Sequence, residues 1–136
     1  MDSTSAPYRP VVLVVDDETV IAETFSTILR KSGYSVVTAY DGEAALEAAL
    51  DAPPGLIISD VMLPGMNGIE LAITIRRIFP DCKVILASGQ SHTPRLLSKA
   101  AEAGHQFVCL QKPIHPALLL EHVANCLQSE VTLATA

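Results

Sequence analysis

Aromatic and basic side chains are scarce in this sequence, and their scarcity argues against one broad class of function. The 136 residues include no tryptophan, and aromatic residues make up 4% of the chain. Lysine and arginine together number 9, against 15 aspartates and glutamates, which leaves a formal net charge of −6. Surfaces that bind nucleic acid usually carry an excess of positive charge, aromatic rings that stack on bases, or both. We therefore expect no direct contact with nucleic acid.

Long hydrophobic runs are also missing, although hydrophobic residues make up 49% of the chain. The uninterrupted apolar runs have the length of a β-strand, whereas a membrane-spanning helix needs about 20 apolar residues. The first residues contain no basic segment followed by an apolar one. We therefore expect neither a secretory signal nor membrane insertion.

Cysteine is sparse, and the spacing of the cysteines indicates the cellular compartment in which the protein is found. The three cysteines are odd in number and lack the spacing of metal ligands; they are Cys82, Cys109 and Cys126. Such residues are typical of free thiols in a reducing environment. Together with the absence of a signal, they predict a cytoplasmic location.

Hydrophobic runs of strand length alternate with segments of helical periodicity throughout residues 11–128. The predicted strands cover residues 11–15, 35–39, 56–59, 83–87 and 107–110. The predicted helices cover residues 18–32, 42–51, 68–79, 94–103 and 116–128. Strict alternation of this kind predicts one α/β domain, a doubly wound five-stranded parallel sheet with helices on both faces. Residues 1–10 are expected to form a flexible lead-in, and residues 129–136 a frayed C-terminal tail.

Polar side chains stand at the ends of four of the five predicted strands. Asp16 and Asp17 follow the first strand, Asp60 the third, Ser88 the fourth and Lys112 the fifth. In a parallel α/β sheet, ligands bind outside the carboxyl ends of the strands. Three carboxylates, a hydroxyl and an ammonium group are therefore expected to converge, and this set suits a hard cation and a phosphoryl group.

Each of these residues also has an ordinary structural explanation. Asp16 or Asp17 could cap a helix, and Asp60 could be a turn residue. Ser88 could bond its own backbone, and Lys112 could simply be solvated. Three clustered carboxylates repel one another unless a cation lies among them, however, and Mg²⁺ prefers carboxylates, waters and phosphate oxygens. The combination favours a magnesium site in which Asp60 is the nucleophile toward phosphorus.

The same residues carry a resemblance to a known family. Over about residues 11–128 the chain resembles the receiver domain of two-component response regulators. The matching positions, in the order of the family, are Asp16, Asp17, Asp60, the loop Met62-Leu63-Pro64-Gly65-Met66-Asn67-Gly68, Ser88 and Lys112-Pro113. The resemblance implies the flavodoxin-like strand order 2-1-3-4-5 and a cis peptide bond between Lys112 and Pro113.

The resemblance also implies a function. A histidine kinase or histidine phosphotransfer protein would donate a phosphoryl group to Asp60. Mg²⁺ would be held by Asp17, Asp60 and the backbone carbonyl of Met62, with Asp16 acting mostly through water. Ser88 and Lys112 would couple phosphorylation to a change in the surface that meets an unknown downstream protein. The chain would be no enzyme beyond catalysing its own phosphotransfer and dephosphorylation.

The chain departs from the family pattern at two places. Cys109 stands where the family usually has Tyr or Phe, and Phe107 lies two residues earlier, where it could partly substitute. Met62 stands two residues after the nucleophile, where members often have a polar side chain that orients water. Gln90, two residues after Ser88, can hydrogen-bond water, whereas Met62 cannot do so well. Because of Met62 we expect slow autodephosphorylation. Because of Cys109 we expect an output that relies less on the rotation of an aromatic side chain.

Three other functions fit the sequence less well. An aspartyl phosphatase usually needs an acid two residues after its nucleophile, where this chain has Met62. A flavin-binding domain would need a Ser-, Thr- or Gly-rich loop after the first strand, not two aspartates. A metal-free scaffold would not need the complete acidic set.

Leu118, on the polar side of the last predicted helix, is either a poorly placed core residue or an exposed partner contact.

Overall fold

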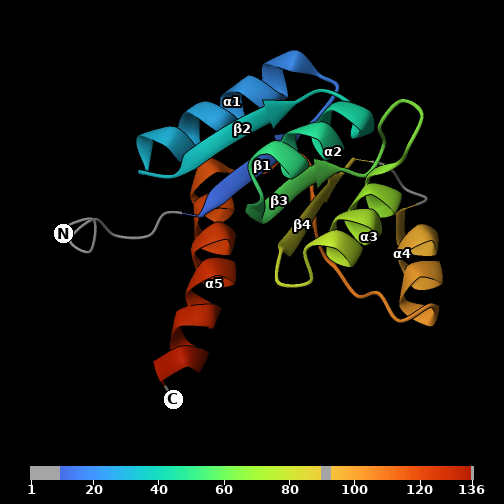
Figure 1. The fold of residues 1–136 in the computed structure, drawn as a ribbon. Coiled ribbons are helices and arrows are strands. Elements are labelled where there is room, and N and C mark those ends of the chain that lie inside the picture. Colours follow the sequence, from blue (N-terminus) through green and yellow to red (C-terminus); the bar gives the residue numbers. More distant parts are fainter. Residues whose placement is uncertain (1–9, 90–92, 136) are drawn as a thin grey trace.

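A parallel sheet between two layers of helices forms the protein (Figure 1). The structure is a computed structural model that describes residues 10–89 and 93–135. Along the chain the elements are β1 (Val11–Val15), α1 (Thr19–Lys31), β2 (Ser35–Ala39), α2 (Gly42–Asp51), β3 (Pro54–Asp60), α3 (Gly68–Ile78), β4 (Lys83–Ser88), α4 (Thr93–Glu102), β5 (Val108–Gln111) and α5 (Pro116–Thr135). Among the described residues the sheet has five strands in the order β2-β1-β3-β4-β5. The predicted fold class and strand order are confirmed.

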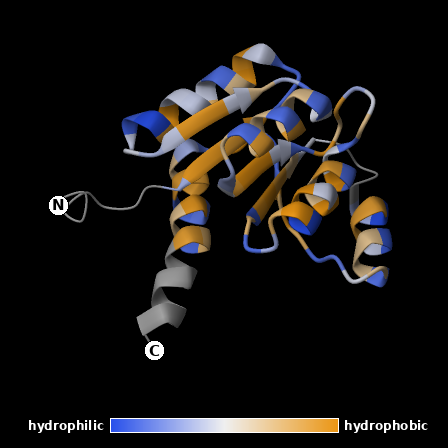
Figure 2. Cartoon of the chain, viewed as in Figure 1, coloured by the Kyte–Doolittle hydropathy of each residue, from blue (hydrophilic) through white to orange (hydrophobic). Residues whose placement is uncertain are grey.

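The two faces of the sheet carry separate hydrophobic cores because successive side chains of a strand point to opposite faces. In β1, Val12 and Val14 pack with residues of α1 and α5, whereas Leu13 and Val15 pack with residues of α2, α3 and α4. Figure 2 shows that the central strands are hydrophobic along their length, as expected for strands covered on both faces. Helix layers on both faces leave the strand ends as the place for polar chemistry.

Local signals explain where several helices begin and end. The side chain of Asp41 accepts a backbone hydrogen bond at the start of α2, and Asn67 and Glu70 form a reciprocal capping box at the start of α3. Gly33 and Gly104 follow α1 and α4 with φ values of 96° and 95°, a conformation that glycine adopts without strain.

Some element boundaries differ from the sequence prediction. Strand β3 begins at Pro54, two residues before the start of the predicted strand; a proline is tolerated as the first residue of a strand. Strand β5 begins at Val108, so Phe107 lies just outside it. Helix α5 was predicted to end at Gln128 but continues to Thr135, through most of the expected tail. Residues 129–135 contain neither proline nor glycine to end the helix.

The buried side of α5 is centred on Leu119 and Val123, which are fully buried, whereas Leu120 and Leu127 are half-buried. Leu118 is 41% exposed, which excludes the interpretation of this residue as part of the core.

Some sequence-based expectations lie outside the described residues. These are the conformation of residues 1–9 and the position of Gln90. Within residues 10–89 and 93–135, no helix combines the length and the hydrophobicity needed to cross a bilayer.

Candidate functional site

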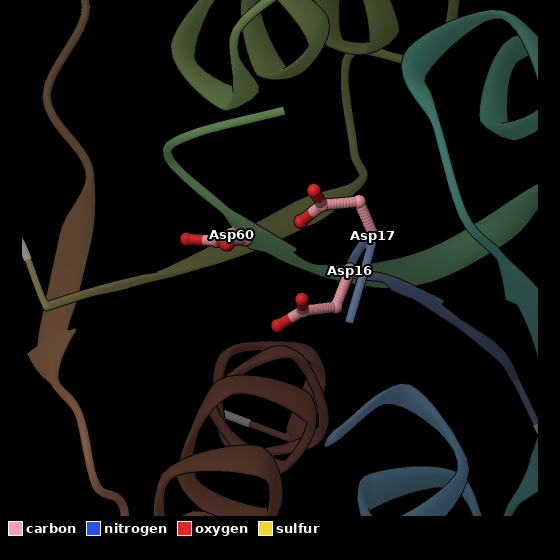
Figure 3. Close-up of side chains that lie close together, drawn as sticks. All are labelled: Asp16, Asp17 and Asp60. Carbon is pink, nitrogen blue, oxygen red and sulfur yellow. The ribbon is translucent and has the colours of Figure 1, made fainter. Parts of the chain in front are cut away.

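Three carboxylates meet at the carboxyl ends of β1 and β3. Asp16 and Asp17 directly follow β1, and Asp60 is the last residue of β3. The two strands are neighbours in register, with Val15 opposite Ser59, so the three side chains extend from adjacent strand ends (Figure 3). One carboxylate oxygen from each residue lies within 4.8 Å of the others. Asp16 and Asp60 are buried, whereas Asp17 is exposed to solvent.

Lys112 brings a positive charge to this cluster from the end of β5. Its Nζ lies 2.8 Å from Asp16 Oδ2 and 3.3 Å from Asp60 Oδ2. The sequence predicted that this ammonium group would converge with the carboxylates, and the structure shows that its closer partner is Asp16. The Lys112-Pro113 peptide bond is cis, as predicted. The backbone N–H of Lys112 donates to the carbonyl oxygen of Ser88 at 2.9 Å, which holds the ends of β4 and β5 together.

Backbone groups orient the two buried carboxylates. The N–H of Glu18 donates to Asp16 Oδ1 at 2.9 Å, and the N–H of Met62 donates to Asp60 Oδ1 at 3.3 Å. Each carboxylate therefore has one oxygen held by the following backbone and the other facing Lys112. Glu18 occupies the N-cap position of α1, and no side chain of the described residues makes a capping hydrogen bond there.

Ser88 lies beside Asp60 on the neighbouring strand. Asp60 is opposite Ala87 in the β3–β4 register, so Ser88 is one residue beyond it, at the end of β4. Ser88 is buried, with 5% of its surface exposed. Next to it, a Cβ added at Gly89 would meet Lys112 Cβ at 3.9 Å, an ordinary contact distance.

The surroundings shift the pKa values of the two central charged groups. Burial raises the pKa of the Asp60 carboxyl, and the negative charge of Asp16 raises it further, against the opposing effect of Lys112. For Lys112, burial lowers the pKa, but the hydrogen bond to Asp16 and the charges of both carboxylates outweigh it and raise the pKa overall. Lys112 is therefore a stable positive charge, while Asp60 holds its own charge less readily than a solvated aspartate.

Sequence reasoning missed the role of Gly68 in shaping the site. A Cβ added at this first residue of α3 would lie 2.1 Å from the carbonyl oxygen of Asp60. The N–H of Gly68 donates to the carbonyl oxygen of Val61 at 2.8 Å, which closes the chain after Asp60 into a tight loop. Only a residue without a side chain permits this approach. The sequence shows a glycine after Asn67, but it does not show that this glycine packs against the backbone of Asp60.

The region around Cys109 differs from the expected aromatic arrangement. Cys109 is half-buried on β5, and burial raises the pKa of its thiol. Phe107, considered as a substitute ring, is held elsewhere: the guanidinium carbon of Arg76 lies 4.7 Å from the centre of its ring. The imidazole of His105 stacks on it with ring centres 6.3 Å apart, and Arg76 also donates to the carbonyl oxygen of Gln106 at 3.1 Å. Phe107 is thus tied to α3.

The acidic cluster fits a divalent metal ion by its chemistry. Three ionised carboxylates and the single ammonium of Lys112 leave two negative charges uncompensated (three minus one). Carboxylate oxygens with access to solvent are the ligands that Mg²⁺ prefers, because this ion retains several waters. Exposed Asp17 faces that solvent. The carbonyl of Met62 remains a predicted ligand.

Comparison with known proteins agrees with this geometry. The sequence model of the response regulator receiver domain matches residues 12–124. The chain is 37% identical over 101 residues to the probable transcriptional regulatory protein TcrX of Mycobacterium tuberculosis, covering 74% of this chain and 43% of that protein. It is 33% identical over 120 residues to a cyclic di-GMP phosphodiesterase of Thermotoga maritima, covering 88% of this chain and 32% of that protein. The chain therefore spans less than half the length of these two relatives.

Solved structures show the same architecture. A CheY-like response regulator receiver domain protein from Methanospirillum hungatei superimposes with a TM-score of 0.83 and 27% identity, covering 92% of this chain and 98% of that one. The strand order, the clustered aspartates and the family match agree with one another. The chain belongs to the family of response regulator receiver domains, which act in two-component phosphorelay signalling with a phosphodonor and a downstream effector.

Proposed function

We propose that the protein is a phosphorylated switch in which Asp60 accepts a phosphoryl group from a phosphohistidine in a divalent-cation-dependent reaction. The donor would be a histidine kinase or a histidine phosphotransfer protein. The observation that carries this proposal is the meeting of Asp16, Asp17 and Asp60 within 4.8 Å, with Lys112 Nζ 3.3 Å from the Asp60 carboxylate.

The transfer exchanges one bond for another. An oxygen of the Asp60 carboxylate attacks phosphorus, the phosphorus–nitrogen bond to the donor imidazole breaks, and the imidazole nitrogen keeps the electron pair. Asp16, Asp17, Asp60 and the Met62 carbonyl would hold Mg²⁺, which when bound offsets the negative charge of the phosphoryl oxygens. The product is an acyl phosphate on Asp60.

Lys112 and Ser88 would receive the new group. The Lys112 ammonium already lies between Asp16 and Asp60, so a small movement allows it to pair with a phosphoryl oxygen. The hydroxyl of Ser88, at the end of the adjacent strand, would donate to another oxygen. We propose no turnover of external substrates: the protein would catalyse only its own phosphorylation and dephosphorylation.

Intact-mass measurement with acetyl phosphate tests this proposal. The parent protein should gain the mass of one phosphoryl group when Mg²⁺ is present and none when the ion is chelated. Asp60→Asn should gain nothing under either condition. Asp81→Asn, a matched change at an exposed aspartate between α3 and β4, should be labelled like the parent. Labelling of Asp60→Asn equal to that of the parent would contradict the assignment.

Intact-mass measurement, combined with an assay for hydrolysis of an external phosphate ester, separates the alternative functions. An aspartyl phosphatase would release phosphate from p-nitrophenyl phosphate over many turnovers, whereas a self-modifying receiver would not. A metal-free scaffold would neither bind Mg²⁺ nor gain mass. Sustained hydrolysis of the external ester that depends on Asp60 would replace the proposal with an enzymatic one.

A further inference from the structure

The segment that follows the proposed nucleophile is held firmly in the fold. We call residues 61–67, between β3 and α3, the β3–α3 loop. Val61 is fully buried and Leu63 is 9% exposed, so both anchor the loop in the core. Between them Met62 is 41% exposed and carries the carbonyl expected to bind Mg²⁺. Gly68 closes the loop through its hydrogen bond to Val61.

A second anchor of this loop lies on a different element, α2. Met66 is half-buried against the core and rests on Gly42, the first residue of α2. A Cβ added at Gly42 would lie 3.1 Å from Met66 Cβ and 3.3 Å from Met66 Sδ. Cβ is bonded directly to the backbone, so rotating the Met66 side chain does not relieve the contact. The β3–α3 loop or the start of α2 would have to move by a few tenths of an ångström.

We propose that Gly42 is a positioning residue for the magnesium site: its lack of a side chain lets Met66 seat on α2 and so sets the position of the Met62 carbonyl. This inference rests on the proposed function. It assigns to the start of α2, which contributes none of the proposed ligands, a part in the geometry of metal binding. Gly42 itself touches neither metal nor phosphoryl group.

Comparing the binding of Mg²⁺ with that of Ca²⁺ distinguishes a displaced ligand from general damage to the fold. Mg²⁺ requires near-octahedral geometry with ligands at about 2.0–2.1 Å, whereas Ca²⁺ accepts more ligands at about 2.3–2.6 Å in flexible arrangements. A displaced carbonyl therefore weakens Mg²⁺ binding more than Ca²⁺ binding. General damage to the fold would weaken both ions alike.

Protein stability is expected to change in the opposite direction from metal affinity. Glycine within a helix is less favourable than alanine, so Gly42→Ala improves the intrinsic helix propensity of α2 while crowding Met66. The Tm of Gly42→Ala should consequently stay within a few degrees of the parent. A loss of Mg²⁺ affinity without a matching loss of Tm distinguishes positioning from a merely structural role.

Metal titrations followed by NMR amide shifts test the inference on three proteins. Gly42→Ala should bind Mg²⁺ roughly three- to tenfold more weakly than the parent and Ca²⁺ less than about twofold more weakly, because of the difference in geometric tolerance. Thr27→Ala, an exposed change on α1 that also raises helix propensity, is the control and should bind both ions like the parent. Unchanged Mg²⁺ binding in Gly42→Ala, or an equal loss for the two ions, would overturn the inference.

A double-mutant cycle isolates the contact itself. Met66→Gly removes the Cβ that an alanine at position 42 would crowd. In that background, Gly42→Ala should change Mg²⁺ affinity by less than about twofold, although Met66→Gly alone loosens the loop. An identical loss in both backgrounds would exclude Met66 as the link. If the parent binds no Mg²⁺ at all, the proposed function fails as well; if only the Gly42→Ala effect is missing, that function stands.

Discussion

The acidic end of the sheet and the region around the start of β5 are built in different ways. At the acidic end, Asp16, Asp60 and Lys112 come from the ends of three strands and are largely buried, and Lys112 Nζ lies 2.8 Å from Asp16 and 3.3 Å from Asp60. Near β5, Phe107 is half-exposed and is held by Arg76 and His105. One region concentrates charge in the interior, and the other anchors a ring at the surface.

The difference indicates which part of a receiver is constrained by chemistry. Phosphoryl transfer needs carboxylates, a cation and a hydroxyl at one point, so each group has little freedom. Coupling phosphorylation to the protein surface needs only a contact that differs between the phosphorylated and the unphosphorylated site. Here Cys109 replaces the usual ring, and Arg76 fixes the nearby Phe107 to α3 instead. We expect changes at the acidic end to alter the chemistry and changes near β5 to leave it intact.

The largest expected effect is that of Asp17→Ala on metal binding. Loss of one of three clustered carboxylates should weaken Mg²⁺ binding roughly tenfold or more, as measured by titration calorimetry. Asp81→Ala removes the same charge far from the cluster and serves as the control. Undiminished affinity in Asp17→Ala would remove this residue from the proposed ligands.

The second expected effect concerns the stability of Asp60→Asn and its pH dependence. Because the pKa of Asp60 is raised by burial and by Asp16, its ionised form destabilises the folded protein above that pKa. The variant should therefore melt a few degrees higher than the parent at pH 7. The difference should shrink as the pH falls through the raised pKa toward the ordinary pKa of an aspartate, 3.8. The Tm values are measured in metal-free buffer. A Tm difference between Asp60→Asn and the parent that grows as the pH falls would contradict a raised pKa of Asp60.

A third, local effect is expected for Arg76→Ala. The change removes the contact with the Phe107 ring and the hydrogen bond to Gln106, together worth about 1 kcal/mol of stability. Hydrogen exchange should accelerate in residues 103–107, while the rate of labelling by acetyl phosphate stays at the parent level. Arg77→Ala, at an exposed neighbouring position, is the control. Slower labelling in Arg76→Ala would show that the two regions are not separable.

A smaller effect is expected at the solvent-exposed Met62. Its side chain cannot hydrogen-bond water well, whereas an asparagine amide beside Asp60 can position an attacking water. Met62→Asn should lose its phosphoryl group about threefold faster than the parent, followed by intact mass after removal of the donor. Met62→Leu keeps the apolar character and should behave like the parent. Equal or slower loss in Met62→Asn would contradict the argument from water orientation.

The smallest effect is expected for Cys109→Ala. The thiol is small and half-buried, so its removal leaves little new space. The change in hydrogen exchange of α4 upon phosphorylation should remain nearly that of the parent. If the response of α4 disappears in this variant, Cys109 is itself part of the coupling.

Much of the candidate site was predictable because its residues stand at strand ends. The apolar runs ending at Val15 and Ser59 marked two buried parallel strands, and the aspartates that follow them had to share one edge of the sheet. Lys112 was predicted near Asp60 by the same reasoning. Its shorter contact with Asp16 was not, because a distance between two flexible side chains depends on how the strands twist and pack.

The sequence by itself determined the order of elements, the parallel sheet and the meeting of Asp16, Asp17 and Asp60. Hydrophobic periodicity acts locally and is readable in a single chain. Only the tertiary structure decided that Gly68 packs against Asp60, that Met66 packs on Gly42 and that the guanidinium of Arg76 lies over the ring of Phe107. These contacts join residues from different elements. Their distances follow from close packing of the whole domain, which no local pattern encodes.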